Sequence, residues 1–407
     1  MIGTAGAAHA APHEASAAPR TGGPMLNNCW IVDADAHVNP PASVWDYLDD
    51  EYRPRRPYLV TLAENDANRG PLNSFWVVDG HTIPNPIGPG AIPGGVPPTS
   101  AYTRSKVAYS VPSQALTDAA ARVADLDRLG IDAQVIFPGV TFAQMTRDPL
   151  FEAALYRSYN RYMAQACRPA ATRLNWAGLV PLRHVPAAVA EVEHVKALGS
   201  SALVIYGTAG EQMLSTRVLD PVWDAAAAAN LPICIHVGRS FPALAETVES
   251  AFAATGFSLT LPILMAFFSL IEGGVLDRYP GLRFAFLEAG SLWVPFLVDR
   301  LDEYYRIMRL KGHPWTWRLP AEEPSAYLRR GQLYVTPEAE DRWLPDIIQL
   351  VGEDHVMYAS DIPHVELRDN AALEYLERDD LSDAVKRKIL GENAGRFYGL
   401  TPPRTDR

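Results

Sequence analysis

The chain has 407 residues, of which 48% are hydrophobic, and this is enough for one large core or two smaller ones. Its net charge of −11 and its pI near 5.4 argue against a nucleic acid or an anionic membrane surface as the partner. The three cysteines are widely spaced and form no CxxC motif, which indicates a reducing, cytoplasmic compartment without a disulfide framework. No apolar run reaches the length of a transmembrane helix.

The amino-terminal residues, 1–27, are rich in Ala, Gly and Pro and contain almost no large apolar side chains. They lack the basic start and the leucine-rich centre of a secretory signal. We therefore predict a disordered tail. Because His9 and His13 lie in it, we do not count these two histidines as candidate ligands.

The first predicted strand covers residues 31–38. Asp33, Asp35 and His37 alternate along it, and alternate residues of a strand point to one face. An Asn-Pro-Pro run ends the strand directly after this stretch. In parallel α/β proteins the carboxyl ends of the strands carry the chemistry, so Asp35 and His37 are candidate metal ligands. Taken alone, such an Asp-x-His pair is more often a carboxylate that holds an imidazole in a turn.

Residues 53–112 interrupt the regular pattern. Six prolines and four glycines fall between positions 84 and 98, a density that excludes a helix or a central strand there. A structureless segment of this length in a compact protein is usually functional or disordered. We expect a lid over the end of the first strand or an arm that contacts another subunit, with disorder as the alternative. Four aromatic residues favour an ordered role: Phe75, Trp76, Tyr102 and Tyr109.

Helical and strand patterns alternate regularly after this segment. Seven further strands are expected, at 133–137, 175–182, 202–206, 232–238, 282–288, 332–336 and 356–361. Helices are expected between them, at 114–129, 149–167, 186–198, 221–229, 264–278, 292–309 and 342–351. Such alternation predicts right-handed βαβ units and a parallel sheet.

Eight βαβ units in a chain of this length favour a closed (β/α)8 TIM barrel with a long irregular insertion after strand 1. An open doubly wound sheet is the alternative, although no Gly-x-Gly-x-x-Gly motif follows a strand. We expect one barrel domain over 28–400, with 53–112 as its lid or arm. A helix over 381–397 should cover one end of the barrel.

Metal-competent residues end four of the predicted strands. Asp35 and His37 end the first, His236 the fifth, Glu288 the sixth and Asp361 the eighth. In a barrel these ends meet at one rim, where imidazole nitrogen and carboxylate oxygen suit a divalent ion. Each residue alone has a simpler explanation: His236 could be a core histidine, and the two acidic residues could be caps. All five together are much harder to obtain by chance.

Several motifs carry a resemblance to a known family. They are Asp-Ala-Asp-Ala-His at 33–37, Ile-His-Val-Gly at 235–238, Gly-Val-Leu-Asp-Arg-Tyr-Pro-Gly at 274–281, Tyr-Ala-Ser-Asp-Ile-Pro-His at 358–364 and Glu-Asn-Ala-Gly-Arg-Phe-Tyr-Gly-Leu at 392–400. This pattern resembles the amidohydrolase superfamily, and specifically the amidohydrolase-related group with aminocarboxymuconate-semialdehyde decarboxylase and γ-resorcylate decarboxylase. The motifs span nearly the whole chain after the tail, and they are specific for the superfamily but not for one reaction.

The resemblance implies roles for the residues at the strand ends. Asp35 and His37 match the ligand pair of the first strand, and His236 matches the ligand of the fifth. Asp361 matches an aspartate that binds metal and exchanges a proton with water. Glu288 is a departure, because members of the group often have a histidine at that place. It could be an acid or base with a raised pKa, or an anionic ligand that draws in a second cation.

These observations lead to one expected site. The metal ligands are Asp35, His37, His236, Glu288 and Asp361, and the last two of these also act in catalysis. They would hold one or two divalent ions, Zn or Mn, with Fe possible. Candidate substrate-binding residues are Arg239, His364 and Glu338. For these three the simpler explanations are a surface ion pair, a loop histidine held by an aspartate, and a solvated carboxylate.

The expected function is hydrolysis or non-oxidative decarboxylation (a carboxy-lyase reaction) of a small carboxylate-bearing substrate. One alternative is a binuclear iron-containing oxygenase on the same scaffold. Another is a non-catalytic partner subunit that stabilises an active paralogue in a hetero-oligomer. By analogy with relatives, we expect a homo-oligomer. We interpret Cys234, which shares the parity of His236, as part of the core and not as a nucleophile.

Overall fold

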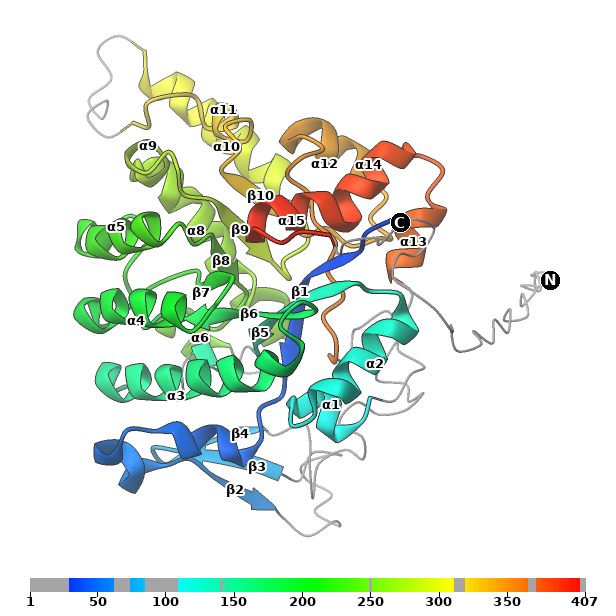
Figure 1. The fold of residues 1–407 in the computed structure, drawn as a ribbon. Coiled ribbons are helices and arrows are strands. Elements are labelled where there is room, and N and C mark those ends of the chain that lie inside the picture. Colours follow the sequence, from blue (N-terminus) through cyan, green and yellow to red (C-terminus); the bar gives the residue numbers. More distant parts are fainter. Residues whose placement is uncertain are drawn as a thin grey trace, which may run out of the picture.

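The computed structural model describes residues 29–61, 74–84, 109–139, 142–143, 145–248, 251–310, 319–364 and 371–402. The predicted tail at 1–27 lies outside the described residues. Seven parallel strands form a curled sheet, and three more form a separate antiparallel sheet, β2-β3-β4 (Figure 1). The order in the parallel sheet is β1 (Val32–Val38), β5 (Ala133–Pro138), β6 (Leu174–Leu179), β7 (Ala202–Tyr206), β8 (Ile233–His236), β9 (Phe284–Leu287) and β10 (Leu333–Val335).

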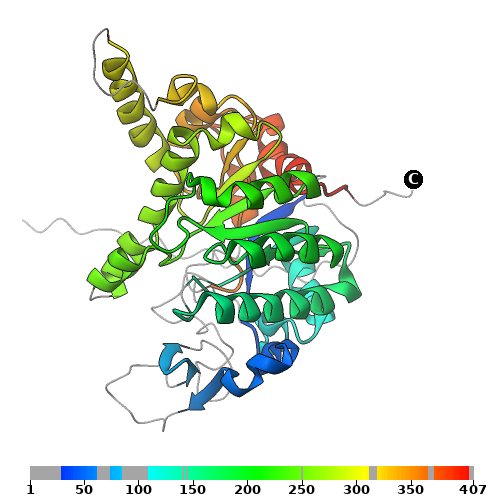
Figure 2. The same cartoon turned by 90° about the vertical axis from the view of Figure 1, so that its left-hand side faces the viewer.

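Helices connect the strands and cover the outside of the curled sheet (Figures 1 and 2). They are α1 (Val111–Ala115), α2 (Ala119–Leu129), α3 (Pro149–Cys167), α4 (Val185–Ala197), α5 (Asp220–Ala229), α6 (Pro242–Thr247), α7 (Ala251–Ala253), α8 (Leu261–Glu272), α9 (Val275–Arg278), α10 (Trp293–Met308), α11 (Pro324–Tyr327), α12 (Leu344–Val351) and α13 (Ala371–Glu377). Local sequence sets their ends. The Asp148 side chain caps α3 by accepting from the N–H groups of Leu150 and Phe151, and Gly130 ends α2 with a φ of 73°. No helix in the described ranges is long and apolar enough to cross a membrane.

The prediction of a parallel sheet with alternating helices is confirmed for seven strands. The parallel strands are buried on both faces, and this explains why they read as continuous apolar runs in the sequence. All three cysteines are free and buried. Cys234 is fully buried in β8, as expected for a core residue.

The prediction of an eighth strand at 356–361 is wrong. This segment forms a single β-bridge, between Val356 and Val335, and no regular strand. Its backbone nevertheless bonds to both edges of the sheet: Met357 N–H to the Val335 carbonyl at 3.0 Å, and Ala34 N–H to the Tyr358 carbonyl at 2.9 Å. The N–H of Ser360 is shared between the Asp35 carbonyl of β1 at 3.3 Å and a side chain, Asp33 Oδ1, at 2.9 Å.

The prediction that residues 53–112 are irregular is also wrong in part. Within 53–112 the structure contains β2 (Tyr58–Thr61), β3 (Ser74–Val78) and β4 (His81–Pro84), and α1 begins just before its end. A hairpin joins β3 to β4 through Asp79 and Gly80, which both have positive φ. An Asp-Gly pair of this kind is the strongest short hairpin signal in a sequence. Trp76 packs edge-on against Trp45 at 6.0 Å and fixes β3 to the rest of the protein. Residues 62–73 and 85–108 lie outside the described residues.

The carboxyl-terminal helix predicted at 381–397 is divided into three pieces. They are α14 (Asp383–Arg387), a π-helical turn (Lys388–Glu392) and α15 (Asn393–Tyr398). The break lies beside Trp30, whose backbone carbonyl occupies the space next to Gly391 and whose indole ring lies against Gly395. Tyr398 donates a hydrogen bond to the Ala34 carbonyl of β1 at 2.8 Å. This end of the chain therefore packs directly on the strand that carries Asp35 and His37.

The close approach of Gly391 to Trp30 generates a prediction. A Gly391→Ala substitution would place a Cβ against the Trp30 carbonyl oxygen, so the backbone must shift. We expect the free energy of unfolding to fall by about 1–3 kcal/mol, measured by chemical denaturation. Gly281→Ala is the control, because no atom lies within 4 Å of its Cβ position. Equal stability of the two variants would contradict the packing described above.

Candidate metal centre

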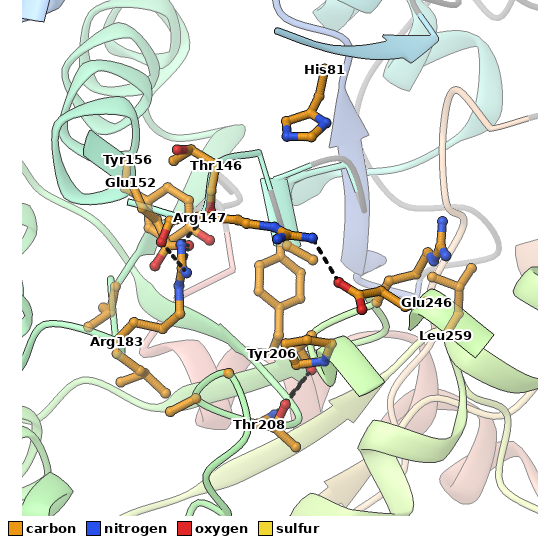
Figure 3. A pocket seen from close by; sticks show the side chains of 18 of the residues that line it. His81, Thr146, Arg147, Glu152, Tyr156, Arg183, Tyr206, Thr208, Glu246 and Leu259 are labelled. Carbon is orange, nitrogen blue, oxygen red and sulfur yellow. Dashed lines mark hydrogen bonds and ion pairs between the residues drawn. The ribbon is translucent and has the colours of Figure 1, made fainter. Parts of the chain in front are cut away.

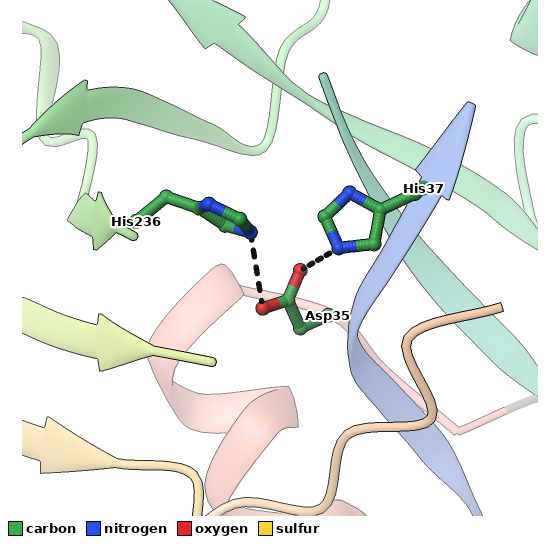
Figure 4. Close-up of side chains that lie close together, drawn as sticks. All are labelled: Asp35, His37 and His236. Carbon is green, nitrogen blue, oxygen red and sulfur yellow. Dashed lines mark ion pairs between the residues drawn. The ribbon is translucent and has the colours of Figure 1, made fainter. Parts of the chain in front are cut away.

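All five predicted ligands meet at the carboxyl end of the parallel sheet. The two carboxylate oxygens of Asp35 lie 3.6 Å from the Nε2 atoms of His37 and His236, one on each side (Figure 4). Glu288, directly after β9, places Oε2 3.2 Å from Nε2 of His236. Asp361 Oδ1 lies 3.8 Å from Nε2 of His37. The structure therefore brings together two imidazoles and three carboxylates, and their role as metal ligands stays a prediction.

The atoms that face the centre of this group are buried and have no hydrogen-bond partner in the described part of the chain. They are both carboxylate oxygens of Asp35, Nε2 of His37, Nε2 of His236, Oε2 of Glu288 and Oδ1 of Asp361. Buried polar atoms without a partner are costly, so their convergence indicates that a cation belongs between them. With metal–ligand bonds of about 2.0–2.2 Å, neighbouring ligand atoms lie about 3.0–3.5 Å apart, which is close to the separations above. The group therefore fits a divalent ion.

The histidines are already oriented for ligation. Nδ1 of His236 donates to the Val237 carbonyl at 2.9 Å, which leaves the lone pair on Nε2, the atom that faces the group. The ring of His37 stacks on the ring of His364, with centroids 3.9 Å apart and an interplanar angle of 10°. Burial lowers the pKa of His37 well below its usual value and also lowers the pKa of His236. Both lowered pKa values favour the neutral imidazole, the form that can bind a metal.

The carboxylates divide into two kinds. Burial and the neighbouring Glu288 raise the pKa of Asp35 and of Asp361 well above the usual value. Burial also acts on Glu288, but its hydrogen bond to His364 and the nearby His236 outweigh it, so the pKa of Glu288 is lowered. Of the two roles left open for Glu288, the structure favours the anionic ligand over the acid with a raised pKa. Without a metal, burial favours the protonated forms of Asp35 and Asp361.

Backbone conformation directs two of the carboxylates. Glu288 and Asp361 have φ values of 59° and 56°, in the left-handed region that residues other than glycine rarely adopt. Each follows directly on a buried stretch and turns the chain out of the strand direction. Strained backbone of this kind is found preferentially at functional sites, where the surrounding structure holds it.

The three candidate substrate-binding residues have different positions. His364 belongs to the centre, because its Nδ1 lies 3.3 Å from Glu288 Oε1 and forms a second possible ligand group with His37 and Glu288. Glu338 is exposed beyond β10, and its charge contributes to the raised pKa of Asp361. Arg239 lies outside the centre, three residues after His236, and donates a hydrogen bond to the Ala245 carbonyl.

Residues at and after the ends of β7 and β8 line a cavity of about 460 Å³ (Figure 3). Tyr206 forms its wall toward the centre, since it pairs with His236 in the ladder between these strands. The hydroxyls of Thr208 and Ser240 line the same cavity and lie 3.0 Å apart. His81 and its neighbour in β4 reach it from the antiparallel sheet, and in Figure 3 His81 lies at the opposite end of the cavity from Thr208.

The charge of the cavity lining is uneven. It contains three arginines and two glutamates. Arg183 pairs with Glu152 and Arg147 pairs with Glu246. Within the described ranges, Arg239 has no carboxylate partner. The cavity lining therefore contains one arginine whose charge is not compensated by a described carboxylate.

Sequence reasoning missed a set of buried polar residues around the ligands. Arg122 and Gln134 are fully buried, and hydrogen bonds connect them to Asp33 of β1. One signal was available, because Gln134 is a polar residue inside an otherwise apolar strand run. Nothing in the helical pattern around Arg122 distinguishes it from a solvated arginine.

The raised pKa of Asp35 generates a prediction about the metal-free protein. Its folded-state pKa exceeds the unfolded value, so the stability that it contributes is present at low pH and is lost as the pH rises through the folded pKa. In chelator, Asp35→Asn should therefore unfold at a higher temperature than the wild type at neutral pH, with a smaller difference in acid. Circular dichroism melts over a pH series measure this, and Asp50→Asn, at an exposed aspartate, is the control. Wild-type protein that melts higher at neutral pH would contradict the assignment.

The comparisons with known proteins agree with this geometry. The amidohydrolase family model matches residues 32–400. A 2-amino-3-carboxymuconate-6-semialdehyde decarboxylase from Dictyostelium discoideum is 22% identical over 290 residues, 69% of this chain and 76% of the relative.

Two of the solved structures with this fold serve as examples. An amidohydrolase from Mycobacterium avium subsp. paratuberculosis has a TM-score of 0.72 at 22% identity, and the match covers 91% of this chain and 100% of that one. A 5-carboxyvanillate decarboxylase from Novosphingobium aromaticivorans, complexed with manganese and 4-hydroxy-3-methoxy-5-nitrobenzoic acid, has a TM-score of 0.67 at 19% identity, and the match covers 94% and 99%. The resemblance found in the motifs is confirmed, and the chain belongs to the amidohydrolase family of enzymes.

Proposed function

We propose that this protein is a divalent-metal-dependent decarboxylase that removes a carboxyl group, without oxidation, from a small carboxylated aromatic compound. The observation that carries the proposal is the convergence of unpartnered ligand atoms from Asp35, His37, His236, Glu288 and Asp361. The decarboxylases among its relatives support this reaction over hydrolysis of the same class of substrate. We also infer that residues 356–361, as an irregular eighth segment, close the seven-stranded sheet into a barrel, which their hydrogen bonds to both sheet edges support.

The residues of the centre define how an ion would be held. The donor set of imidazole nitrogen and carboxylate oxygen suits Mn or Zn. When bound, such an ion supplies a Lewis acid that polarises an oxygen of the substrate. Asp35, His37 and His236 are completely buried, whereas the side chains of Glu288, Asp361 and His364 are 14%, 14% and 18% exposed. The substrate therefore approaches from the side of these last three residues.

Asp361 is suited to the proton step. Decarboxylation breaks the bond between the ring carbon and the carboxyl group, CO₂ leaves, and the carbon must accept a proton. Asp361 stands at the accessible edge, and burial beside Glu288 raises its pKa, so of the carboxylates there we assign to it the proton that passes to carbon. Glu288 is ionised and holds His364 by a hydrogen bond at 3.3 Å, which orients that imidazole toward an incoming substrate.

The cavity beside the centre accounts for the substrate class. Arg239 lies on its wall and supplies the uncompensated positive charge, which suits a second acidic group on the substrate. Tyr206, Thr208 and Ser240 supply hydroxyls for phenolic or ether oxygens. A cavity of about 460 Å³ lies in the range of small-molecule sites.

A binuclear iron oxygenase is the second candidate, and one observation favours it. His37, Glu288 and His364 form a further possible ligand group that shares His37 with the first. Elemental analysis of the purified protein distinguishes the two functions. About one Mn or Zn per chain supports the decarboxylase, and two metals including Fe support the oxygenase. Release of CO₂ from hydroxylated benzoates, without oxygen consumption, then tests the reaction itself.

The metal assignment predicts the effect of removing one ligand. His236→Ala should reduce bound metal to background and abolish turnover, because it deletes a fully buried ligand that no neighbour can replace. The fold, followed by circular dichroism, should persist. His194→Ala, at a half-buried histidine of α4, should retain both metal and activity. Wild-type metal content in the His236 variant would show that the centre is assigned wrongly.

The role of Arg239 predicts a change in substrate affinity alone. Arg239→Gln removes a charge-assisted hydrogen bond, worth about 1.5–3 kcal/mol, so KM should rise about 10- to 100-fold. Metal content and kcat should change little, because Arg239 does not contact the ligands. Arg217→Gln, at an arginine whose side chain is 70% exposed, is the matched control. An unchanged KM would remove Arg239 from the substrate site.

A further inference from the structure

A buried chain of hydrogen bonds leads from helix α2 to the segment that carries Asp361. Arg122 Nε donates to Gln134 Oε1 at 2.9 Å, and Gln134 Nε2 donates to Asp33 Oδ2 at 2.7 Å. Asp33 in turn accepts from both the N–H and the hydroxyl of Ser360. Arg122, Gln134 and Asp33 are fully buried, and Ser360 is 6% exposed. The chain thus ends at the residue before Asp361.

The same guanidinium also holds the residue after Asp361. Arg122 Nη2 donates to the Ile362 carbonyl at 3.2 Å and to the His37 carbonyl at 2.9 Å. One nitrogen therefore joins the backbone of a β1 ligand to the backbone next to Asp361. His37 N–H bonds to the same Ile362 carbonyl at 2.6 Å. Asp361 is thus held through both of its neighbours.

This arrangement meets a specific need of the centre. Residues 356–361 form no regular strand, and Asp361 bonds to the backbone of β1 through its N–H, to the Asp35 carbonyl at 3.0 Å, without a continuous ladder on either side. Asp361 also has a left-handed backbone, with a φ of 56°, which relaxes unless its surroundings prevent it. Arginine suits the task because its rigid, planar group of donors binds several acceptors at fixed angles. No carboxylate in the described ranges forms an ion pair with Arg122, so its role is to connect acceptors.

We propose that Arg122, Gln134 and Asp33 are positioning residues that set the separation between the β1 ligands and Asp361, and thereby set the affinity for the metal. Their side chains do not reach the point where the ligand atoms of the centre meet. The inference rests on the proposed function, since it needs a bound metal. Partners of this kind behind the ligands typically change metal affinity about 10- to 100-fold when they are removed.

The first test replaces the amide in the middle of the chain. Gln134→Met keeps the size of the side chain but removes both hydrogen bonds. The dissociation constant for Mn²⁺, measured by competition with a chelating indicator, should rise about 10- to 100-fold. The visible absorption spectrum of the Co²⁺-loaded protein should change as well, because it reports the geometry of the ligands.

The matched control is Gln332→Met. Gln332 is also buried, and its Nε2 donates to three backbone carbonyls, the nearest at 3.1 Å. It precedes β10 and so lies at the opposite end of the sheet from the centre. We expect its melting temperature to fall as that of Gln134→Met does, while Mn²⁺ affinity and the Co²⁺ spectrum stay at the wild-type values.

Arg122→Lys separates charge from geometry. A lysine keeps the positive charge but cannot bind Gln134 and the two carbonyls together, so its Mn²⁺ affinity should fall as in Gln134→Met. Wild-type affinity in either variant, or an equal loss in Gln332→Met, would overturn the inference while leaving the metal centre in place. If Gln134→Met does not fold, Ser360→Ala tests the same chain at its far end, with the same expected loss of affinity. Wild-type protein that binds no divalent metal would overturn the proposed function together with this inference.

Discussion

The structure depends on one electrostatic constraint, which is that ligand atoms of two imidazoles and three carboxylates are buried together without hydrogen-bond partners in the described part of the chain. Such a group is unfavourable in a folded chain unless a cation compensates it. The raised pKa values of Asp35 and Asp361 express this cost, because the metal-free fold favours their protonated forms. The parallel sheet makes the arrangement possible, since the carboxyl ends of its strands deliver side chains to one place from positions far apart in the sequence.

Holding the group together requires more than strand geometry. The sheet has seven regular strands, and Asp361 comes from a segment that hydrogen bonds attach to the edges β10 and β1. Asp33 stands in the same strand as Asp35 and His37, yet it accepts hydrogen bonds from Gln134 and Ser360. It therefore connects β1 to the segment that carries Asp361. Arg122 then ties that segment back to His37. Polar side chains here supplement the backbone hydrogen bonds of this segment, which do not form a regular ladder.

The surroundings of the centre are asymmetric, and this gives the chemistry a direction. The buried ligands Asp35, His37 and His236 form its floor, and Asp361 and His364 lie at its accessible edge. The cavity with Arg239 extends to the antiparallel sheet, whose residue His81 lines it. A lid or arm after the first strand was expected, and the described part of that segment does reach the cavity. Its remaining residues lie outside the described ranges.

The sequence by itself determined the strand and helix alternation and the positions of the five candidate ligands. Both follow from local rules, because apolar runs end at Pro, Gly and polar residues, and side chains alternate along a strand. It did not reveal the irregular eighth segment, the division of the last helix beside Trp30, or Arg122 and Gln134 behind the ligands, and the Asp-Gly hairpin at 79–80 was overlooked. Distances, the opposite pKa shifts of Glu288 and Asp361, and the cavity were decided only by the tertiary structure. The physical reason is that burial and charge act through space between residues that local patterns treat as independent.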